Sequence, residues 1–571
     1  MFTVHTRPAA WVMALAGVLA LGAVPVRAAA PYAGTWKTTI QLPGQNISLF
    51  LIQIEEKDGK PVAKVLSAAD SNLKDGAVKS IKTDAKSIHF DVEAGGGDFA
   101  FAAYYPKDGA KNKNPAGSVA FANRRDIVEL ERTDLKELDP QKASTRSPGL
   151  ADAQKAMQIK DAKEREVAVN QFLDKYPEGG ISFAMRVSML ARAVQESGAE
   201  ADLRGKADKL VEFAATYGPE MKLHALQIVT QIFLSSDKLS DLALAYAQQA
   251  EKALDESLTA GQQMSVLKLL AAALKKSGKT DDIKPLKSRM AKLDAVLDEE
   301  FAKKAIPFKP ESAKPRVGES NRVVLVELFT GVTCPPCVAA DVAFDALLQS
   351  HNPADVVMLQ YHLHIPRPDP LTNEDSASRS EFYRLKGKLK GTPTVLLDGN
   401  EVEELGGGRP QAKASYDKLI QTLSGELGSK PSGQLKLSAK QAAGKINIHA
   451  TVSDLKDPGE AVRLHLVLVE EVVHFAGSNG QRLHHHVVRA FPGGVKGIPL
   501  KEASASHDVT ASIAGLHKSL NDYLAQNKFD EDSRPLDLKN LKVVGFIQNE
   551  KTQEVIQAAQ TDLGESKSET E

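Results

Sequence analysis

The sequence predicts a multidomain protein in which an antiparallel β domain, a helical region, an α/β domain and a C-terminal β-rich segment follow one another. The length supports this, because 571 residues exceed what one hydrophobic core can serve and favour three or four domains. The hydrophobic period supports it too. It changes along the chain from the alternation of strands to the three-and-four spacing of helices, and then to apolar strands set between helices.

Bulk charge favours neither nucleic acid nor a membrane surface as a partner. Lys and Arg number 72 against 73 Asp and Glu, for a net charge of -1. A chain without a dominant basic field is not built to bind nucleic acid or an anionic membrane surface, so we expect neither partner.

The first 28 residues are predicted to be a signal peptide. A basic start with His5 and Arg7 precedes an apolar run over residues 9–24, and small residues then fit cleavage after Ala28. We therefore expect a periplasmic or secreted protein with no membrane span once the signal is removed. A retained membrane anchor is the alternative, although the run is shorter than the roughly 20 residues that a spanning helix needs.

Residues 32–135 are predicted to form the antiparallel β-rich domain. Short alternating segments at residues 47–52, 87–92 and 127–130 are separated by turns such as Asp58-Gly59. The segment carries no mark of a ligand, so a structural or docking role is preferred to a ligand-binding cup.

Residues 147–304 are predicted to be helical, because apolar residues such as Val169, Phe172 and Leu173 recur at helical spacing. Residues 172–177 and 213–218 echo each other, and the region resembles tetratricopeptide-type helical hairpins. That resemblance implies a surface for another protein, with an α-helical spacer as the alternative.

Two proline- or glycine-containing linkers bracket the α/β domain. The first covers residues 305–320 and the second lies near residues 428–433. After it, strand patterns such as residues 464–469 and 543–547 predict a C-terminal β-sandwich over residues 434–563. The polar tail, residues 564–571, is expected to be disordered.

The two cysteines of the chain stand three positions apart, in Cys334-Pro335-Pro336-Cys337. They follow an apolar run at residues 322–329, typical of a buried strand, and precede a predicted helix at residues 338–349. Free N–H groups and the dipole at a helix start lower the pKa of a thiol there. Cys334 is therefore the expected nucleophile, and Cys337 the thiol that resolves a mixed disulfide.

Three alternatives to redox chemistry remain. A static disulfide would be a poor staple, worth on the order of 2 kcal/mol for so short a loop. A soft metal could be held with help from His362 and His364. The domain could also be a redox-inert descendant of its fold.

Downstream, Thr392-Pro393 opens another strand and is a candidate cis peptide. With CxxC, this order of elements resembles the thioredoxin fold over residues 321–424, and Glu327-Leu328-Phe329-Thr330 looks like a branch of exported bacterial thioredoxin-like proteins. The resemblance implies that Thr392 and Pro393 bind substrate beside the cysteines. It also implies that Glu327 exchanges a proton with Cys337, against the alternative of a surface or salt-bridged Glu.

The sequence departs from the family at two points. Thr333 stands where many thioredoxins have Trp, and the CxxC dipeptide is Pro-Pro, so the family's redox potential cannot be transferred. Other clusters carry weaker hypotheses. His484-His485-His486 could suggest a metal, residues 361–372 could wall a substrate groove, and Gly406-Gly407-Gly408 is interpreted as a turn.

The function predicted is an exported thiol–disulfide oxidoreductase that acts on protein disulfides through Cys334 and Cys337. No cofactor and no metal are expected, and the partners are protein thiols or disulfides, with a membrane or periplasmic redox partner. The alternative is a non-catalytic cell-envelope interaction protein with a redox-inert or regulatory thioredoxin-like domain. Reductase, oxidase and isomerase share this motif, so the direction of electron flow stays open.

Overall fold

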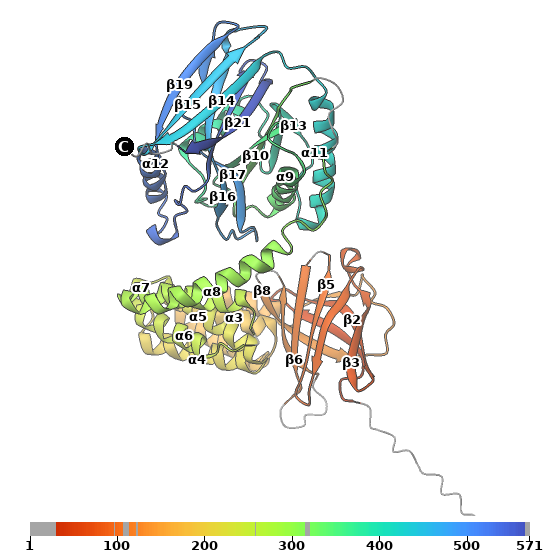
Figure 1. Ribbon diagram of the computed structural model, residues 1–571. Coiled ribbons are helices and arrows are strands. Elements are labelled where there is room, and N and C mark those ends of the chain that lie inside the picture. The colour runs from red at the N-terminus through yellow and green to blue at the C-terminus, as the bar shows by residue number, and fades with distance from the viewer. Residues whose placement is uncertain are drawn as a thin grey trace, which may run out of the picture. The chain divides into compact units, whose positions relative to one another are not determined.

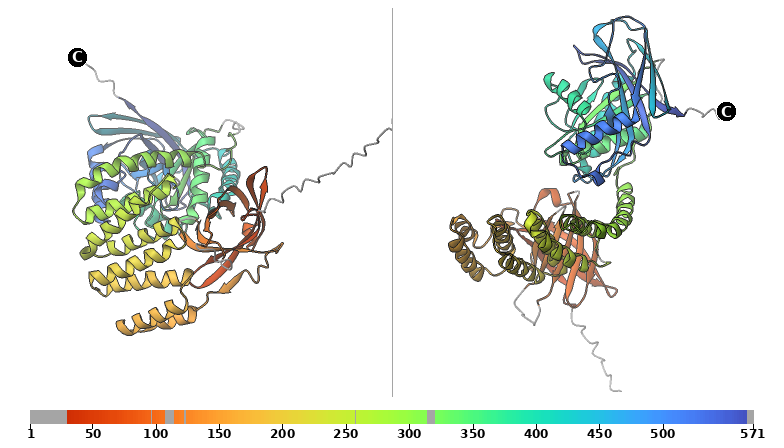
Figure 2. Two further views of the ribbon diagram at one scale, coloured as in Figure 1. Left: turned by 90° about the horizontal axis from the view of Figure 1, so that it is seen from below. Right: turned by 90° about the vertical axis from the view of Figure 1, so that its left-hand side faces the viewer.

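The computed structural model describes residues 30–95, 97–106, 114–121, 124–256, 258–313 and 320–565. The predicted signal peptide lies outside these residues, as does the predicted tail from residue 566 on. The chain divides into two compact units (Figures 1 and 2), the first from Met1–Leu258 and Ser265–Leu286 and the second from Thr259–Met264 and Lys287–Glu571. Across the described residues, none of the helices combines the length and the apolar character needed to cross a membrane.

The first unit begins with a nearly closed antiparallel sheet (Figure 1), in the strand order β3-β2-β1-β8-β7-β6-β5-β4 with β9 paired to β2. Alternate side chains of these strands point inward, and Trp36, Phe50, Phe90 and Phe101 are among those that fill the interior. The strands are β1 (Gly34–Gln41), β2 (Gln45–Lys57), β3 (Lys60–Ala68), β4 (Ala77–Thr83), β5 (Ser87–Ala94), β6 (Gly97–Tyr104), β7 (Ala116–Phe121), β8 (Arg124–Arg132) and β9 (Ser144–Arg146).

Helices follow the sheet, and the first six of them pack side by side in chain order (Figure 2). Their apolar faces are buried at the positions that the helical spacing indicated, among them Val169 and Phe172. The helices are α1 (Leu150–Gln158), α2 (Ala162–Lys175), α3 (Gly180–Gln195), α4 (Glu200–Ala215), α5 (Pro219–Leu234), α6 (Ser240–Lys252), α7 (Ala260–Lys276) and α8 (Ile283–Ala302).

The second unit is built on a mixed sheet in the order β13-β12-β10-β11-β17-β16-β20-β21-β14-β15-β19, with β18 paired to β16. Its strands are β10 (Val324–Thr330), β11 (Val356–His362), β12 (Thr394–Leu397), β13 (Asn400–Val402), β14 (Gln434–Ala442), β15 (Lys445–Ser453), β16 (Gly459–His474), β17 (Leu483–Ala490), β18 (Ile498–Leu500), β19 (Ala505–Ser512), β20 (Leu541–Asn549) and β21 (Val555–Glu565). Its further helices are α9 (Val338–Ser350), α10 (Glu374–Leu385), α11 (Ala412–Leu427) and α12 (Ile513–Gln526).

Strand β10 lies at the centre of the half of this sheet that carries the cysteines. It runs parallel to β11 and antiparallel to β12, and all of its residues are buried. Val326 and Leu328 contact the core beneath α9 and α11, whereas Leu325 and Phe329 contact a second core on the opposite face. The predicted strand at residues 322–329 is thus β10, and its alternation assigns each side chain to one face.

The C-terminal strands differ from the predicted separate β-sandwich. Strand β17 pairs in parallel with β11, with Gln360 opposite Val487, so the sheet continues from one segment into the other. The two segments also share a core, in which Leu325 and Phe329 of β10 lie with Phe546 of β20. Burying apolar residues on both faces of β11 requires this continuation, since an edge strand of such composition would expose them.

Candidate functional site

Cys334 and Cys337 form a disulfide at the carboxyl end of β10, where the chain turns into α9. Cys334 precedes a 3₁₀ turn, Pro335–Cys337, which leads directly into α9 at Val338. Proline fits this first turn because its missing N–H would have no partner there. Both sulfurs are shielded, with Cys334 at 3% and Cys337 at 0% relative exposure, while Pro335 and Pro336 are exposed.

The peptide bond between Thr392 and Pro393 is cis, as the sequence suggested. It lies beside the disulfide, because the Thr392 hydroxyl oxygen is 3.6 Å from the sulfur of Cys334. The structure thus brings four of the predicted site residues together, Cys334, Cys337, Thr392 and Pro393, from segments 58 positions apart.

The three-glycine turn at residues 406–408 packs against the cysteine motif. The Gly407 N–H donates to the Pro336 carbonyl at 2.7 Å, and the Ala339 N–H donates to the Gly407 carbonyl at 2.9 Å. Gly407 has φ +143°, which favours glycine, and a Cβ on Gly406 would lie 3.6 Å from both Pro336 and Pro393. This turn therefore holds the CxxC turn and the cis-proline segment together.

Glu327 is not brought to Cys337. It lies two positions from both Leu325 and Phe329 and therefore shares their face of β10, so its carboxylate enters the core opposite α9. There Arg379 donates to Glu327 at 3.0 and 3.2 Å, and two tyrosine hydroxyls also donate to it. Proton exchange with Cys337 would require a carboxylate on the α9 face, so the arrangement corresponds to the salt-bridged alternative.

The two tyrosines that bond Glu327 are Tyr361, at 2.9 Å, and Tyr383, at 2.5 Å. Burial, together with the neighbouring carboxylate, raises the pKa of both phenols well above the ordinary value. Both stay protonated and act as donors, and the cluster is a fully satisfied buried ion pair.

A second buried polar cluster lies on the α9 face, at the carboxyl ends of β10 and β11. The Gln360 amide donates to Asp341 at 3.3 Å, and the ring of His362 lies between Gln360, at 3.3 Å, and Asp369, at 3.2 Å. Asp369 also accepts the N–H of Val332, two residues before Cys334, at 2.7 Å. The chain of contacts therefore ends on the loop that carries Cys334.

Asp341 was not predicted as a site residue, because its sequence context is that of one more charged residue in a helix. Its spacing, four residues after Cys337, is the signal that could have indicated its position. Positions i and i+4 share a helix face, so the side chain that follows a buried cysteine by one turn is itself directed inward.

The histidines predicted as possible metal ligands make other contacts, and the rings of His362 and His484 pack edge to face with centroids 4.9 Å apart. His364 accepts the N–H of Asp369 at 2.9 Å and contacts the Tyr523 hydroxyl at 2.8 Å. Burial lowers the pKa of His484 to about 3 and that of His486 to about 4, so both rings are neutral. The rings of His484, His485 and His486 contact, respectively, the Phe475 carbonyl at 3.0 Å, the Asp345 carboxylate at 2.8 Å and the Met358 carbonyl at 3.1 Å.

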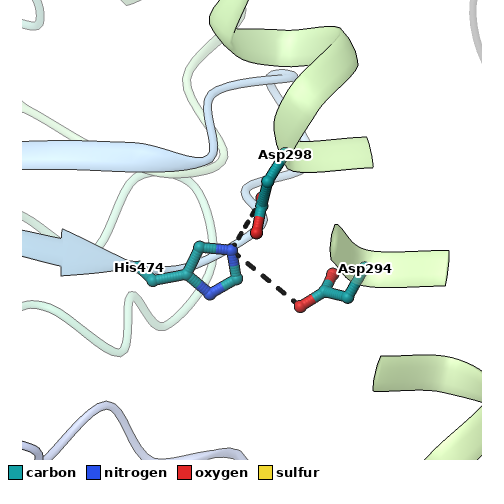
Figure 3. Close-up of side chains that lie close together, drawn as sticks. All are labelled: Asp294, Asp298 and His474. Carbon is teal, nitrogen blue, oxygen red and sulfur yellow. Dashed lines mark hydrogen bonds and ion pairs between the residues drawn. The ribbon is translucent and has the colours of Figure 1, made fainter. Parts of the chain in front are cut away.

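In the described part of the chain, the side chains close enough to share a metal ion are Asp294, Asp298 and His474, whose ligand atoms lie within 4.8 Å of one another. His474, at the end of β16, points between the two carboxylates of α8 (Figure 3). The Arg482 guanidinium already binds both acids, at 2.5 Å and 2.6 Å. It offsets one of their two negative charges, so these three side chains and Arg482 form a partly exposed ion-pair network.

The loop between β16 and β17 packs on the loop that carries Cys334. Asn479 donates from its backbone N–H to the Val332 carbonyl and from its side chain to the Gly331 carbonyl, both at 3.2 Å. Val332 also packs against Val473 and Val487. The C-terminal strands thus hold the approach to the disulfide in place.

Comparisons with known proteins add little to this geometry. No family model matches the chain. No curated protein matches it. Among solved structures it is similar to HBP35 of Porphyromonas gingivalis, with 15% identity over 45% of this chain and 80% of that chain and a TM-score of 0.31. A likeness of this size carries no argument about fold or function.

Proposed function

We propose that this chain is an exported thiol–disulfide oxidoreductase with a thioredoxin-like domain, acting on protein disulfides through Cys334 and Cys337. One observation carries the proposal. The two cysteines form a disulfide at the start of a helix, and the sulfur of Cys334 lies 3.6 Å from the hydroxyl of Thr392 in a cis Thr-Pro segment. That is the juxtaposition that the thioredoxin resemblance implies.

The order and pairing of the surrounding elements support the resemblance. Strands β11, β10, β12 and β13 are neighbours in the sheet, with β10 parallel to β11 and the others antiparallel. Helices α9 and α11 pack together on one face, and α10 contributes Arg379 and Tyr383 to the other. The chain order strand, helix, strand, helix, two strands, helix is the one that the resemblance predicts.

The chemistry follows from the position of each sulfur. A thiolate at Cys334 attacks a substrate disulfide and forms a mixed disulfide, while the substrate's other sulfur leaves as a thiolate. Cys337 then attacks Cys334, the internal disulfide forms, and the remaining substrate sulfur is released. The reverse sequence oxidises a substrate dithiol with the same residues.

A second candidate is a cell-envelope interaction protein in which the disulfide is inert. The 3% exposure of Cys334 favours it, because a protein substrate must reach that sulfur. The helical stack of the first unit offers a surface for such an interaction.

Trapping separates the two candidates. In the full chain, Cys337→Ser removes the thiol that resolves a mixed disulfide at Cys334. Mixed disulfides with envelope proteins should therefore accumulate, and they should disappear on reduction. Cys334→Ser is the matched control and should trap far less. The oxidoreductase proposal fails if Cys337→Ser traps no partner and the wild-type protein does not catalyse insulin reduction.

A further inference from the structure

Asp341 is a buried acid one helical turn after Cys337, and the exchange steps described above do not use it. It lies on the first turn of α9, four residues after Cys337, and is 4% exposed. Cys337 itself has helical backbone angles, φ -78° and ψ -19°, so the i,i+4 relationship holds between the two residues. Helical side chains lean over the turn that precedes them, which directs Asp341 towards Cys337.

The neighbours of Asp341 are polar but few. Gln360 donates to its Oδ1 at 3.3 Å, and Gln360 is fixed in turn by His362 at 3.3 Å. Gln360 and His362 lie two positions apart on β11 and face α9, because Val356 and Met358 of the same register pack in the core beneath α9. The carboxyl group therefore sits in a closed, oriented environment.

Electrostatics keep this acid protonated at neutral pH. Burial, and to a lesser degree the nearby acids, raises the pKa of Asp341 to about 8, although the side chains of Thr330 and Gln360 act in the opposite direction. The groups that face it from the elements packed around it are Asp345 of α9, Thr330 of β10, Gln360 and His362 of β11, Asp369 of the following loop, and Arg409.

We propose that Asp341 is the proton-exchange residue of Cys337 in thiol–disulfide exchange. The inference rests on the proposed function for its biological use. The proton exchange itself needs no protein substrate, because any small thiol can drive it. Asp341 lies on the α9 face of the sheet, whereas Glu327 lies on the opposite face.

The proton follows the electrons in each half of the cycle. When an external thiolate attacks the sulfur of Cys334, the S–S bond breaks, its electron pair goes to the sulfur of Cys337, and Asp341 gives that sulfur its proton. In the resolving step the Cys337 sulfur attacks Cys334, and its proton returns to the Asp341 carboxylate. Gln360 stabilises that carboxylate in between, so no water has to enter the buried site.

The test is reduction of the internal disulfide of the full chain by dithiothreitol from about pH 6 to about pH 10, with rates divided by the thiolate fraction of the reductant. The wild-type rate should fall through an inflection near pH 8, where the acid is lost. In Asp341→Asn the inflection should disappear and the rate below it should drop by up to about 100-fold. Asp345→Asn, the next acid of the same helix, should keep the fast rate and an inflection, which moves to lower pH because the Asp345 charge raises the pKa of Asp341.

A second variant makes the test independent of how well Asp341→Asn folds. Gln360→Leu removes a hydrogen bond that lowers the pKa of Asp341, so the inflection should move to higher pH. An Asp341→Asn profile like that of Asp345→Asn, or an unmoved inflection in Gln360→Leu, overturns the inference. Dithiothreitol needs no protein partner, so the pH profile of the reduction rate does not depend on the trapping experiment. A failure to trap partners would contradict the proposed function and leave the role of Asp341 in disulfide reduction unchanged.

Discussion

The hydroxyl of Thr392 lies 3.6 Å from the sulfur of Cys334, within hydrogen-bond range for sulfur. In the reduced protein this hydroxyl can donate to the thiolate, and hydrogen bonds to charged groups are worth about 1.5 kcal/mol. Thr392→Val should therefore raise the pKa of the Cys334 thiol by about 1. The rate of iodoacetamide labelling of the reduced protein, followed as a function of pH, measures this pKa. Thr394→Val, whose hydroxyl bonds the Gly391 carbonyl instead, should leave the pKa unchanged.

The buried carboxyl group of Asp341 should make the oxidised protein less stable as the pH rises. Its pKa is raised to about 8 in the folded state, so the folded chain holds a proton that the unfolded chain releases near pH 4. Stability is then largest below pH 4 and declines up to pH 8, with a penalty of about 4 kcal/mol at pH 7. Asp341→Asn should be more stable than wild type at pH 7 and nearly equal at pH 4. Urea denaturation followed by circular dichroism at the two pH values tests this, and a difference independent of pH contradicts it.

Arg379 should matter for stability rather than for exchange. Arg379→Met leaves Glu327 charged and unpaired in the core, which costs about 4 kcal/mol. The double variant Glu327→Leu/Arg379→Met removes both charges and should lose less unfolding free energy than the Arg379→Met variant alone. Strictly additive losses of unfolding free energy in urea denaturation would contradict the ion-pair interpretation. Glu327→Gln should leave the pH profile of disulfide reduction unchanged, because its side chain is on the other face of β10.

Substitution by alanine should affect stability differently at two adjacent glycines, Gly406 and Gly407. Gly407 has φ +143°, and an added Cβ would lie 3.0 Å from Gln411, so Gly407→Ala should lose about 2 kcal/mol of stability and disturb the bond to the Pro336 carbonyl. At Gly406 the nearest atoms are 3.6 Å away, and Gly406→Ala should lose less than about 0.5 kcal/mol. Urea denaturation of the two variants compares them. Equal losses would show that the turn does not depend on the backbone of Gly407.

Local patterns predicted the elements around the cysteines because each pattern reflects local chemistry. The β-branched run before Cys334 became β10, and Pro393 after Thr392 is cis. The face taken by Glu327 could not be predicted. Alternation says that Glu327 and Leu328 oppose each other, but only the packing of α9 decides which of them meets the cysteines.

Long-range pairing escaped prediction for a different reason. Val487 lies opposite Gln360 across 127 positions of chain, and one parallel pair leaves no local signature. The C-terminal strands were therefore expected to form a separate sandwich. His484 of β17 also packs against His362, and the burial of the neighbouring Asp341 and Gln360 has no local signature in the sequence.

An oxidoreductase of this kind needs Cys334 to react in the folded protein despite its 3% exposure. Iodoacetamide labelling of the fully reduced native chain, with the two cysteines resolved by peptide mass spectrometry, measures this reactivity. Cys334 should be labelled at least about 100-fold faster than Cys337, and at a pH below the ordinary thiol pKa of about 8.5. Labelling of neither cysteine until the chain is unfolded by urea would contradict it.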